Sequence, residues 1–164
     1  MSVHGGITSA PAGLQIRRAG GWIANPAGAD CEGGLVVRGL KIIVFTCNWN
    51  AYSGLEMAGY ERLSLPAGVR PVKVMCLGRL HPGLVLKAFE LGADGVLMLG
   101  CPPGECHYEF GNSQAEELFE ETKALAHLLG IGGERLRLDW VAAGDGEVFV
   151  EKVQEFVEGM TGSK

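Results

Sequence analysis

The sequence predicts an α/β domain of the flavodoxin-like type, a doubly wound parallel sheet of about four strands with helices on both faces. Two observations lead to this expectation. Short apolar segments alternate along the chain with longer segments of helical periodicity. The apolar segments are continuous rather than alternating with polar residues, which is typical of strands that crossover helices bury on both faces. The chain has 164 residues, the size of one domain with a substantial core.

The sequence predicts two strand–helix pairs in the first half of the domain. The β-branched segment 40–46 (LKIIVFT) predicts a strand, and a helix is expected at 52–62. A second strand is expected at 72–75, followed by a helix at 82–91 that Gly92 ends. Parallel strands need crossover connections of this length, so the intervening helices indicate a parallel sheet.

The second half repeats the alternation. Residues 95–99 (GVLML) predict a third strand, and the capping box of Ser113 and Glu116 predicts the start of a long helix that ends at Gly130. A fourth strand is expected at 136–141 and a last helix at 146–159. The residues expected on the inner faces of these two helices are Leu118, Phe119, Leu125, Leu128 and Leu129, then Phe149, Val153, Phe156, Val157 and Met160.

Residues 1–38 differ in composition from the rest, because they are rich in Gly, Ala and Pro. We expect an extended N-terminal arm there and the α/β domain at 39–164. Such a segment buries too little apolar surface to fold alone. It is therefore either a flexible extension or a segment laid over a partner, with Trp22 and Ile23 as the anchor.

Composition argues against several classes of protein. The formal charge of −5 does not favour a nucleic-acid partner. No apolar run approaches the roughly 18–20 residues of a membrane span. The cysteine count is odd, at five, and no apolar signal segment follows Met1. These features predict a reducing, cytoplasmic setting rather than a secreted disulfide framework.

Cysteines are predicted to meet at one edge of the sheet. Cys47 ends the first strand, Cys76 ends the second, and Cys101 and Cys106 follow the third. The carboxyl ends of parallel strands share an edge where ligands bind, and neighbouring strands are about 4.8 Å apart. In the CPPGEC loop the prolines restrict the backbone and Gly104 permits a sharp turn. We expect one metal or cluster site on these thiols; the alternative is isolated buried cysteines.

The thiols alone do not name the metal. Thiolates hold tetrahedral Zn²⁺ as well as [2Fe-2S] or [4Fe-4S] clusters. Ligands spread over several strand ends favour iron and sulfur, because zinc sites usually use compact pairs. Cys31 lies in the arm and is either a further ligand or a bystander. We favour a bystander, because the arm gives it no fixed geometry.

Residues beside the thiols have more than one interpretation. Trp49 is expected to cover the site or to anchor an interface. His107 has four interpretations: a hydrogen-bond donor near the site, a ligand that replaces one thiol, the base of a Cys–His pair, or a solvated loop residue. Arg79 and His81 either offset charge or face solvent. No glycine-rich phosphate loop follows the first strand, which does not favour nucleotide or flavin binding.

Five motifs carry a resemblance to a known family. They occur in the order 45–49 (FTCNW), 74–79 (VMCLGR), 85–89 (VLKAF), 92–96 (GADGV) and 100–108 (GCPPGECHY). Together they resemble the delta (iron-sulfur) subunit of methyl-viologen-reducing hydrogenase, MvhD. The similarity runs from about Lys41 to the last helix.

The resemblance implies a small protein that carries a [2Fe-2S] cluster on Cys47, Cys76, Cys101 and Cys106. Such a protein passes electrons between an oxidoreductase module and a heterodisulfide-reductase-like flavoprotein, in complexes associated with electron bifurcation. The modules implied include a hydrogenase, a formate dehydrogenase, methylenetetrahydrofolate reductase and benzoyl-coenzyme A reductase.

Two features depart from the family pattern. The first motif commonly reads Cys-Asn-Trp-Cys, and here its last position is Asn50. If the family cluster uses that thiol, this chain holds an altered cluster or none. Typical members also begin near the first strand, so the arm at 1–38 is a second departure.

The leading hypothesis is therefore an electron-transfer subunit that is not an enzyme on its own. The alternative is a structural docking subunit whose thiols bind Zn or no metal. A third hypothesis, a Cys–His enzyme using Cys106 and His107, lacks an identified oxyanion site and third residue.

Overall fold

The computed structural model describes residues 39–162. The arm expected at 1–38, with Trp22, Ile23 and Cys31, lies outside the described residues. The elements in chain order are β1 (Ile42–Cys47), α1 (Asn50–Tyr60), β2 (Val69–Val74), the 3-10 turn η1 (Leu77–Arg79), α2 (Pro82–Glu90), β3 (Gly95–Gly100), α3 (Gly111–Leu128), the 3-10 turn η2 (Gly133–Arg135), β4 (Leu136–Trp140) and α4 (Gly146–Gly162).

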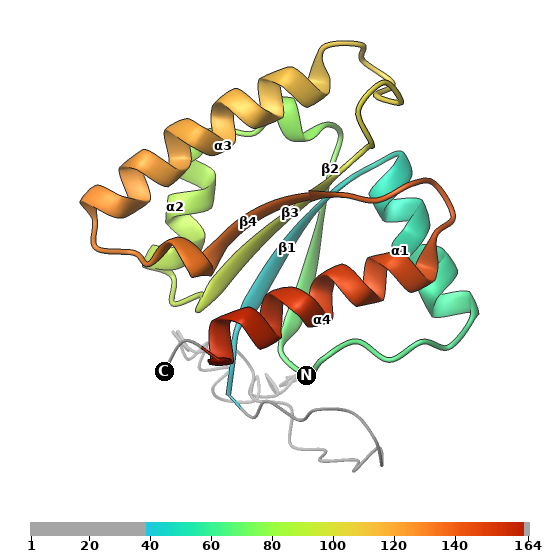
Figure 1. Ribbon diagram of the computed structural model, residues 1–164, viewed down its shortest axis with the longest axis horizontal. Coiled ribbons are helices and arrows are strands. Elements are labelled where there is room, and N and C mark those ends of the chain that lie inside the picture. The colour runs from blue at the N-terminus through green and yellow to red at the C-terminus, as the bar shows by residue number, and fades with distance from the viewer. Residues whose placement is uncertain (1–38, 163–164) are drawn as a thin grey trace, which may run out of the picture. The chain divides into compact units, whose positions relative to one another are not determined.

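The sheet has the strand order β2-β1-β3-β4, and each neighbouring pair is parallel. Helices α2 and α3 cover one face, and α1 and α4 cover the other (Figure 1). This order matches the flavodoxin-like winding, in which the chain reverses direction across the sheet after β2. The predicted doubly wound α/β fold is confirmed.

Strands β1 and β3 form the centre of the core. Every residue of β3 is buried, and Ile42, Val44 and Phe45 of β1 pack beside it. The expectation of burial on both faces is wrong for β2, where residues 70–73 are exposed. Because β2 is an edge strand with one neighbour, it tolerates Pro71, which has no N–H to donate.

The inner face of α4 is confirmed at Phe149, Val153, Phe156 and Val157, which are buried. The expected inner face of α3 is wrong in part, because Leu125, Leu128 and Leu129 are exposed. The buried stripe of α3 follows the helical repeat through smaller residues instead. It consists of Ala115, Leu118, Thr122 and Ala126.

Helix α3 also begins earlier than the capping box predicted. It starts at Gly111, and Ser113 lies inside its first turn without a capping role. A tertiary contact explains the difference. A Cβ atom built on Gly78 of η1 would lie 2.6 Å from the Gly111 carbonyl oxygen, so η1 packs directly against the start of α3. This packing sets the start of the helix in place of the local capping signal.

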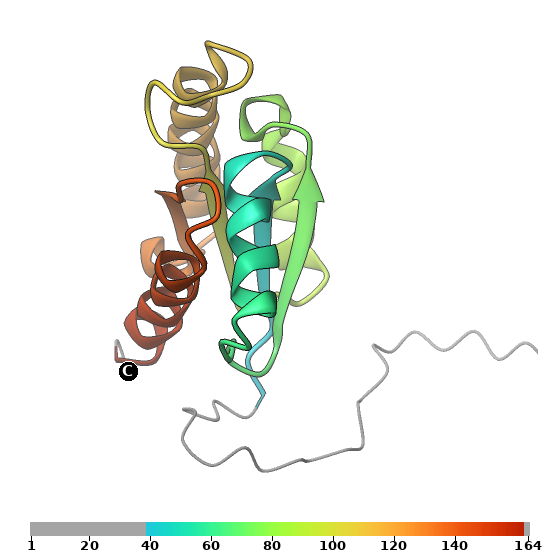
Figure 2. The same ribbon diagram turned by 90° about the vertical axis from the view of Figure 1, so that its right-hand side faces the viewer.

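The loops that follow β1, β2 and β3 lie at one end of the α/β domain (Figure 2). This is the carboxyl edge of the sheet, where the cysteines were expected to meet. Within residues 39–162, none of the helices has both the length and the apolar character required to cross a membrane.

Candidate thiol site

Cys47 is the last residue of β1, and its sulfur lies at the N-terminus of α1. The Ala51 backbone N–H donates a hydrogen bond to this sulfur, with an N–S distance of 3.4 Å. Unpaired N–H groups and the helix dipole at a helix N-terminus favour negative charge on a nearby sulfur. The turn from β1 into α1 therefore supplies a site suited to a thiolate.

Cys101 directly follows β3, which is the neighbour of β1 in the sheet. The Cys101 and Cys47 sulfurs are 3.3 Å apart. Either thiol can donate in this pair, and once Cys47 is ionised only the Cys101 thiol has a proton to donate. Its hydrogen bond lowers the pKa of Cys47 to about 6, against the opposing effect of burial. The same interaction, together with burial, raises the pKa of Cys101.

Cys76 and Cys106 form a second pair beside the first residue of α3. A Cβ atom built on Gly111 would lie 2.5 Å from the Cys106 sulfur and 2.6 Å from the Cys76 sulfur. Both sulfurs therefore occupy space that any larger residue at position 111 would need. The separation of the two sulfurs is at most the sum of these two distances.

The two thiol pairs are close enough for each to shift the pKa values of the other electrostatically. Burial raises the pKa of Cys76, and the neighbouring thiols Cys106 and Cys47 raise it further. The electrostatic effect of the neighbouring Cys106 also contributes to the raised pKa of Cys101. Cys47, Cys76 and Cys101 are buried, whereas Cys106 is half-buried. The four expected thiols are thus gathered at one edge in an inner pair and an outer pair.

The connection between the pairs is a tight loop. Gly104 has a φ of +83°, and the Glu105 N–H donates to the Pro102 carbonyl oxygen at 3.0 Å. The predicted turn at Gly104 is therefore confirmed. Asn112 holds the loop to α3, because its side-chain amide donates to the Cys101 carbonyl oxygen. The Asn112 side-chain oxygen is buried and has no hydrogen-bond partner among the described residues.

Two contacts join the start of α1 to the 101–108 loop, and sequence reasoning missed both. The Asn50 side-chain amide donates to Glu105 Oε2 at 3.0 Å. The Trp49 and His107 rings stack with centroids 3.8 Å apart. We call these two contacts the loop clasp. An aromatic residue beside each of two cysteines was the only sequence signal for it.

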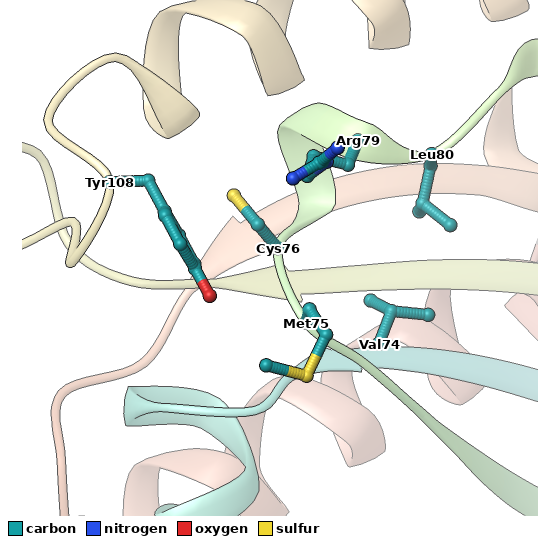
Figure 3. A pocket seen from close by; sticks show the side chains of 6 residues that line it. All are labelled: Val74, Met75, Cys76, Arg79, Leu80 and Tyr108. Atoms are coloured by element: carbon teal, nitrogen blue, oxygen red, sulfur yellow. The ribbon is translucent and has the colours of Figure 1, made fainter.

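The remaining neighbours have separate roles. Nδ1 of His81 accepts the Gly83 N–H at 3.0 Å and so caps α2 rather than contacting a sulfur. Arg79 lines a pocket of about 500 Å³ beside Cys76, together with Met75 and Tyr108 (Figure 3). Within residues 39–162, no hydrogen bond joins His107 to Cys106, so the Cys–His enzyme hypothesis gains no support.

The donor set suits a group that binds several thiolates. Soft thiolate ligands are those of zinc and of iron–sulfur clusters. Backbone N–H groups near the sulfurs and low exposure also suit such a group, because both stabilise and shield sulfur-borne charge. However, the described part of the chain contains no group of three or more His, Cys, Asp or Glu side chains that is placed to hold a single metal ion.

The fold and the cysteine positions define a flavodoxin-like α/β domain with a thiol site at the carboxyl edge of its sheet. The sequence profile of the methyl-viologen-reducing hydrogenase delta subunit matches residues 42–162. The chain belongs to this family, as the resemblance predicted.

Individual relatives carry more specific names. The iron-sulfur subunit of the F420-non-reducing hydrogenase vhc of Methanococcus voltae is 43% identical over 109 residues, which cover 66% of this chain and 76% of the relative. The iron-sulfur subunit of the F420-non-reducing hydrogenase of Archaeoglobus profundus is 42% identical over 116 residues, or 71% of this chain and 85% of the relative.

A further relative is a much larger protein. It is a subunit of the ferredoxin:CoB-CoM heterodisulfide reductase of Methanosarcina mazei, and it is 38% identical over 117 residues. The match covers 71% of this chain but only 15% of that protein. A domain similar to this chain therefore forms a small part of a heterodisulfide reductase polypeptide there.

Proposed function

We propose that this chain is an electron-transfer subunit that holds one [2Fe-2S] cluster on Cys47, Cys76, Cys101 and Cys106. The observation that carries the proposal is the gathering of these sulfurs as two pairs at one edge of the sheet. A cluster with two irons needs two thiolates for each iron. The relatives named as iron-sulfur subunits support an iron–sulfur cluster in general.

Each pair would hold one iron. When bound, such a cluster supplies one-electron redox chemistry. The protein's own contribution is to fix the sulfurs, to exclude water and to stabilise the charge they carry. The Ala51 N–H already donates to Cys47, and the backbone at Gly78 donates towards Cys76. Hydrogen bonds of this kind to sulfur help to set the potential of a cluster.

The partners proposed are a heterodisulfide-reductase-like flavoprotein on one side and a hydrogenase-type oxidoreductase module on the other. The Methanosarcina mazei relative supports the first partner, because a similar domain is joined there to the reductase in one polypeptide. The hydrogenase subunits among the relatives support the second. A formate dehydrogenase or benzoyl-coenzyme A reductase module is an alternative second partner. The chain would act in the cytoplasm and would not be an enzyme on its own.

A second candidate function is a structural docking subunit that binds Zn or no metal. Its metal-free form is favoured because, among the described residues, no group of three or more His, Cys, Asp or Glu side chains is placed to hold a single metal ion. Asn50, which occupies a place where the family commonly has a cysteine, favours it too. In that case electrons would pass only through the neighbouring subunits.

The ligand assignment is tested with serine variants of the full chain purified without oxygen. Cys101→Ser and Cys106→Ser are each expected to abolish the visible absorbance of the cluster while the far-ultraviolet circular dichroism stays near that of the parent chain. Cys31→Ser is the matched control and is expected to leave the absorbance intact. Full absorbance in both loop variants would refute the assignment, and its loss in the control would show that Cys31 supplies a ligand.

A further inference from the structure

We propose that the surface beside Cys76 is the docking face for a redox partner, and that the partner inserts an apolar side chain next to a carboxylate there. This surface, which we call the Cys76 face, consists of Met75, Arg79 and Tyr108 around the pocket at Cys76. The inference rests on the proposed function and adds the location and chemistry of the contact.

The two thiol pairs differ in their access to the surface. The Cys47–Cys101 pair lies deeper, against the N-terminus of α1 and the central strands. In the other pair Cys106 is half-buried, and Cys76 forms part of the wall of the pocket of about 500 Å³. A partner side chain in this pocket would touch a cysteine of the thiol site directly. The pocket therefore offers a short path between the site and another protein.

The rim of the pocket is apolar and exposed. Met75 is 56% exposed and Tyr108 is 40% exposed. Figure 3 shows Tyr108 to the left of Cys76 and Met75 below it, and both line the same pocket as Cys76. Aromatic residues and methionine are enriched in protein interfaces, and their burial contributes about 25 cal/mol per Å² of apolar area. This composition fits an apolar side chain of a partner better than a small polar ligand.

The charge of the Cys76 face indicates which group of the partner lies beside its apolar side chain. Arg79 is exposed, lines the pocket, and has no ion-pair partner within the described part of the chain. In Figure 3 its guanidinium group lies near the Cys76 sulfur. A free cation beside an apolar pocket is complementary to a carboxylate on the partner. A second copy of this chain fits less well, because a symmetric contact would set two like-charged faces against each other.

Photo-crosslinking tests the location. The full chain is expressed in its native host with p-benzoylphenylalanine in place of Met75, and Leu128, exposed at the far end of α3, carries the same probe in a matched control. We expect a crosslink from position 75, but not from position 128, to a flavin-containing or iron-sulfur redox protein identified by mass spectrometry. A crosslink only to a second copy, equal crosslinking from both positions, or no crosslink would overturn the proposal.

A charge reversal tests the proposed carboxylate. In the chain carrying the position-75 probe, Arg79→Glu is expected to lower the crosslink yield about fivefold, and Arg79→Lys to retain most of it, because a rim charge governs association. Lys123→Glu, an equal charge change on the exposed side of α3, is expected to have no effect. An unchanged yield in Arg79→Glu would refute the role of the charge.

Iron content separates failure of this inference from failure of the proposed function. It is measured on every crosslinking sample before irradiation. A chain with about two irons and no crosslink from position 75 would overturn the docking face and leave the proposed function standing. A chain with the crosslink but without iron would support the docking face and contradict the proposed cluster.

Discussion

Replacement of Gly111 by alanine probes the outer thiol pair with a single added carbon atom. That carbon would lie 2.5 Å from the Cys106 sulfur and 2.6 Å from the Cys76 sulfur. Comfortable contacts between heavy atoms begin at about 3.5 Å, so each of the two sulfurs must move by roughly 1 Å. The backbone cannot yield easily, because Gly111 is held against η1 by the close approach of Gly78.

The size of the effect follows from the energetics of overpacking. Inserting a carbon into a close-packed site costs about 1–3 kcal/mol, and every 1.4 kcal/mol changes an equilibrium constant tenfold. In the cluster-free chain the two thiol side chains can rotate away from the added carbon, whereas a bound cluster would fix both sulfurs. We therefore expect Gly111→Ala to shift the balance between cluster-loaded and cluster-free chain about 5- to 150-fold towards the cluster-free form. Alanine is a better helix former than glycine by about 0.5–1 kcal/mol, which offsets part of the cost in the cluster-free chain.

The assay is iron and acid-labile sulfide per chain, with thermal unfolding of the cluster-free protein in parallel. Gly59→Ala in α1 is the control, because a Cβ atom there meets no other atom within 4 Å. We expect the control to retain the parent iron content. Gly111→Ala with the same iron content and spectrum as the parent chain would refute the assignment of Cys76 and Cys106 as one ligand pair.

Three further predictions concern the support around the site. Asn50→Ala is expected to keep the full iron content and to lower the stability by about 1 kcal/mol or less, because its side chain bonds the exposed Glu105 rather than a sulfur; loss of iron would identify Asn50 as a ligand. Gly78→Ala is expected to destabilise the fold by about 1–3 kcal/mol in chemical denaturation, since the new carbon would approach the Gly111 carbonyl oxygen at 2.6 Å; an unchanged midpoint would contradict this packing. In the reduced, metal-free chain, the pKa of Cys47 is about 6, below the ordinary value of 9.0, so the Cys47 thiolate stabilises the fold fully above pH 9 and this stabilisation is lost as the pH falls to about 6. The thermal unfolding midpoint of the parent chain is therefore expected to rise between pH 6 and 9. The same rise in a Cys47→Ser variant would contradict the lowered pKa of Cys47.

The strands and helices were predictable because their signals are local. The continuous apolar runs of β1 and β3 are buried, and the periodic residues of α4 form its inner face. Both features depend on residues close in sequence, which is why no contact between distant segments was needed to recognise them. The same reasoning placed the cysteines at one edge, because parallel strands share their carboxyl ends.

The start of α3 could not be predicted in this way. The Ser113 capping box is a local signal, but the helix begins at Gly111, where η1 packs against it. The inner face of α3 uses small residues such as Ala115 and Thr122, so the larger exposed leucines gave the wrong face. In both places a contact between distant segments overrides the local preference.

The pairing of the thiols also depends on contacts between distant segments. The sequence placed Cys47 at the end of the first strand and Cys101 after the third, but it did not show which sulfurs meet. The second pair depends on a glycine at the start of α3, and the loop clasp depends on Asn50 reaching Glu105 across the site. Sequence motifs pointed to these positions through the resemblance to the family, without indicating their contacts.

The most direct test of the proposed function is the metal content of the full chain isolated without oxygen. Iron, acid-labile sulfide and zinc are measured on one sample, together with the electron paramagnetic resonance spectrum after reduction. The proposed function predicts about two irons and two sulfides per chain and a rhombic signal in the reduced state. Zinc in place of iron, or no metal, would contradict it and would make this chain a structural connector between its redox partners.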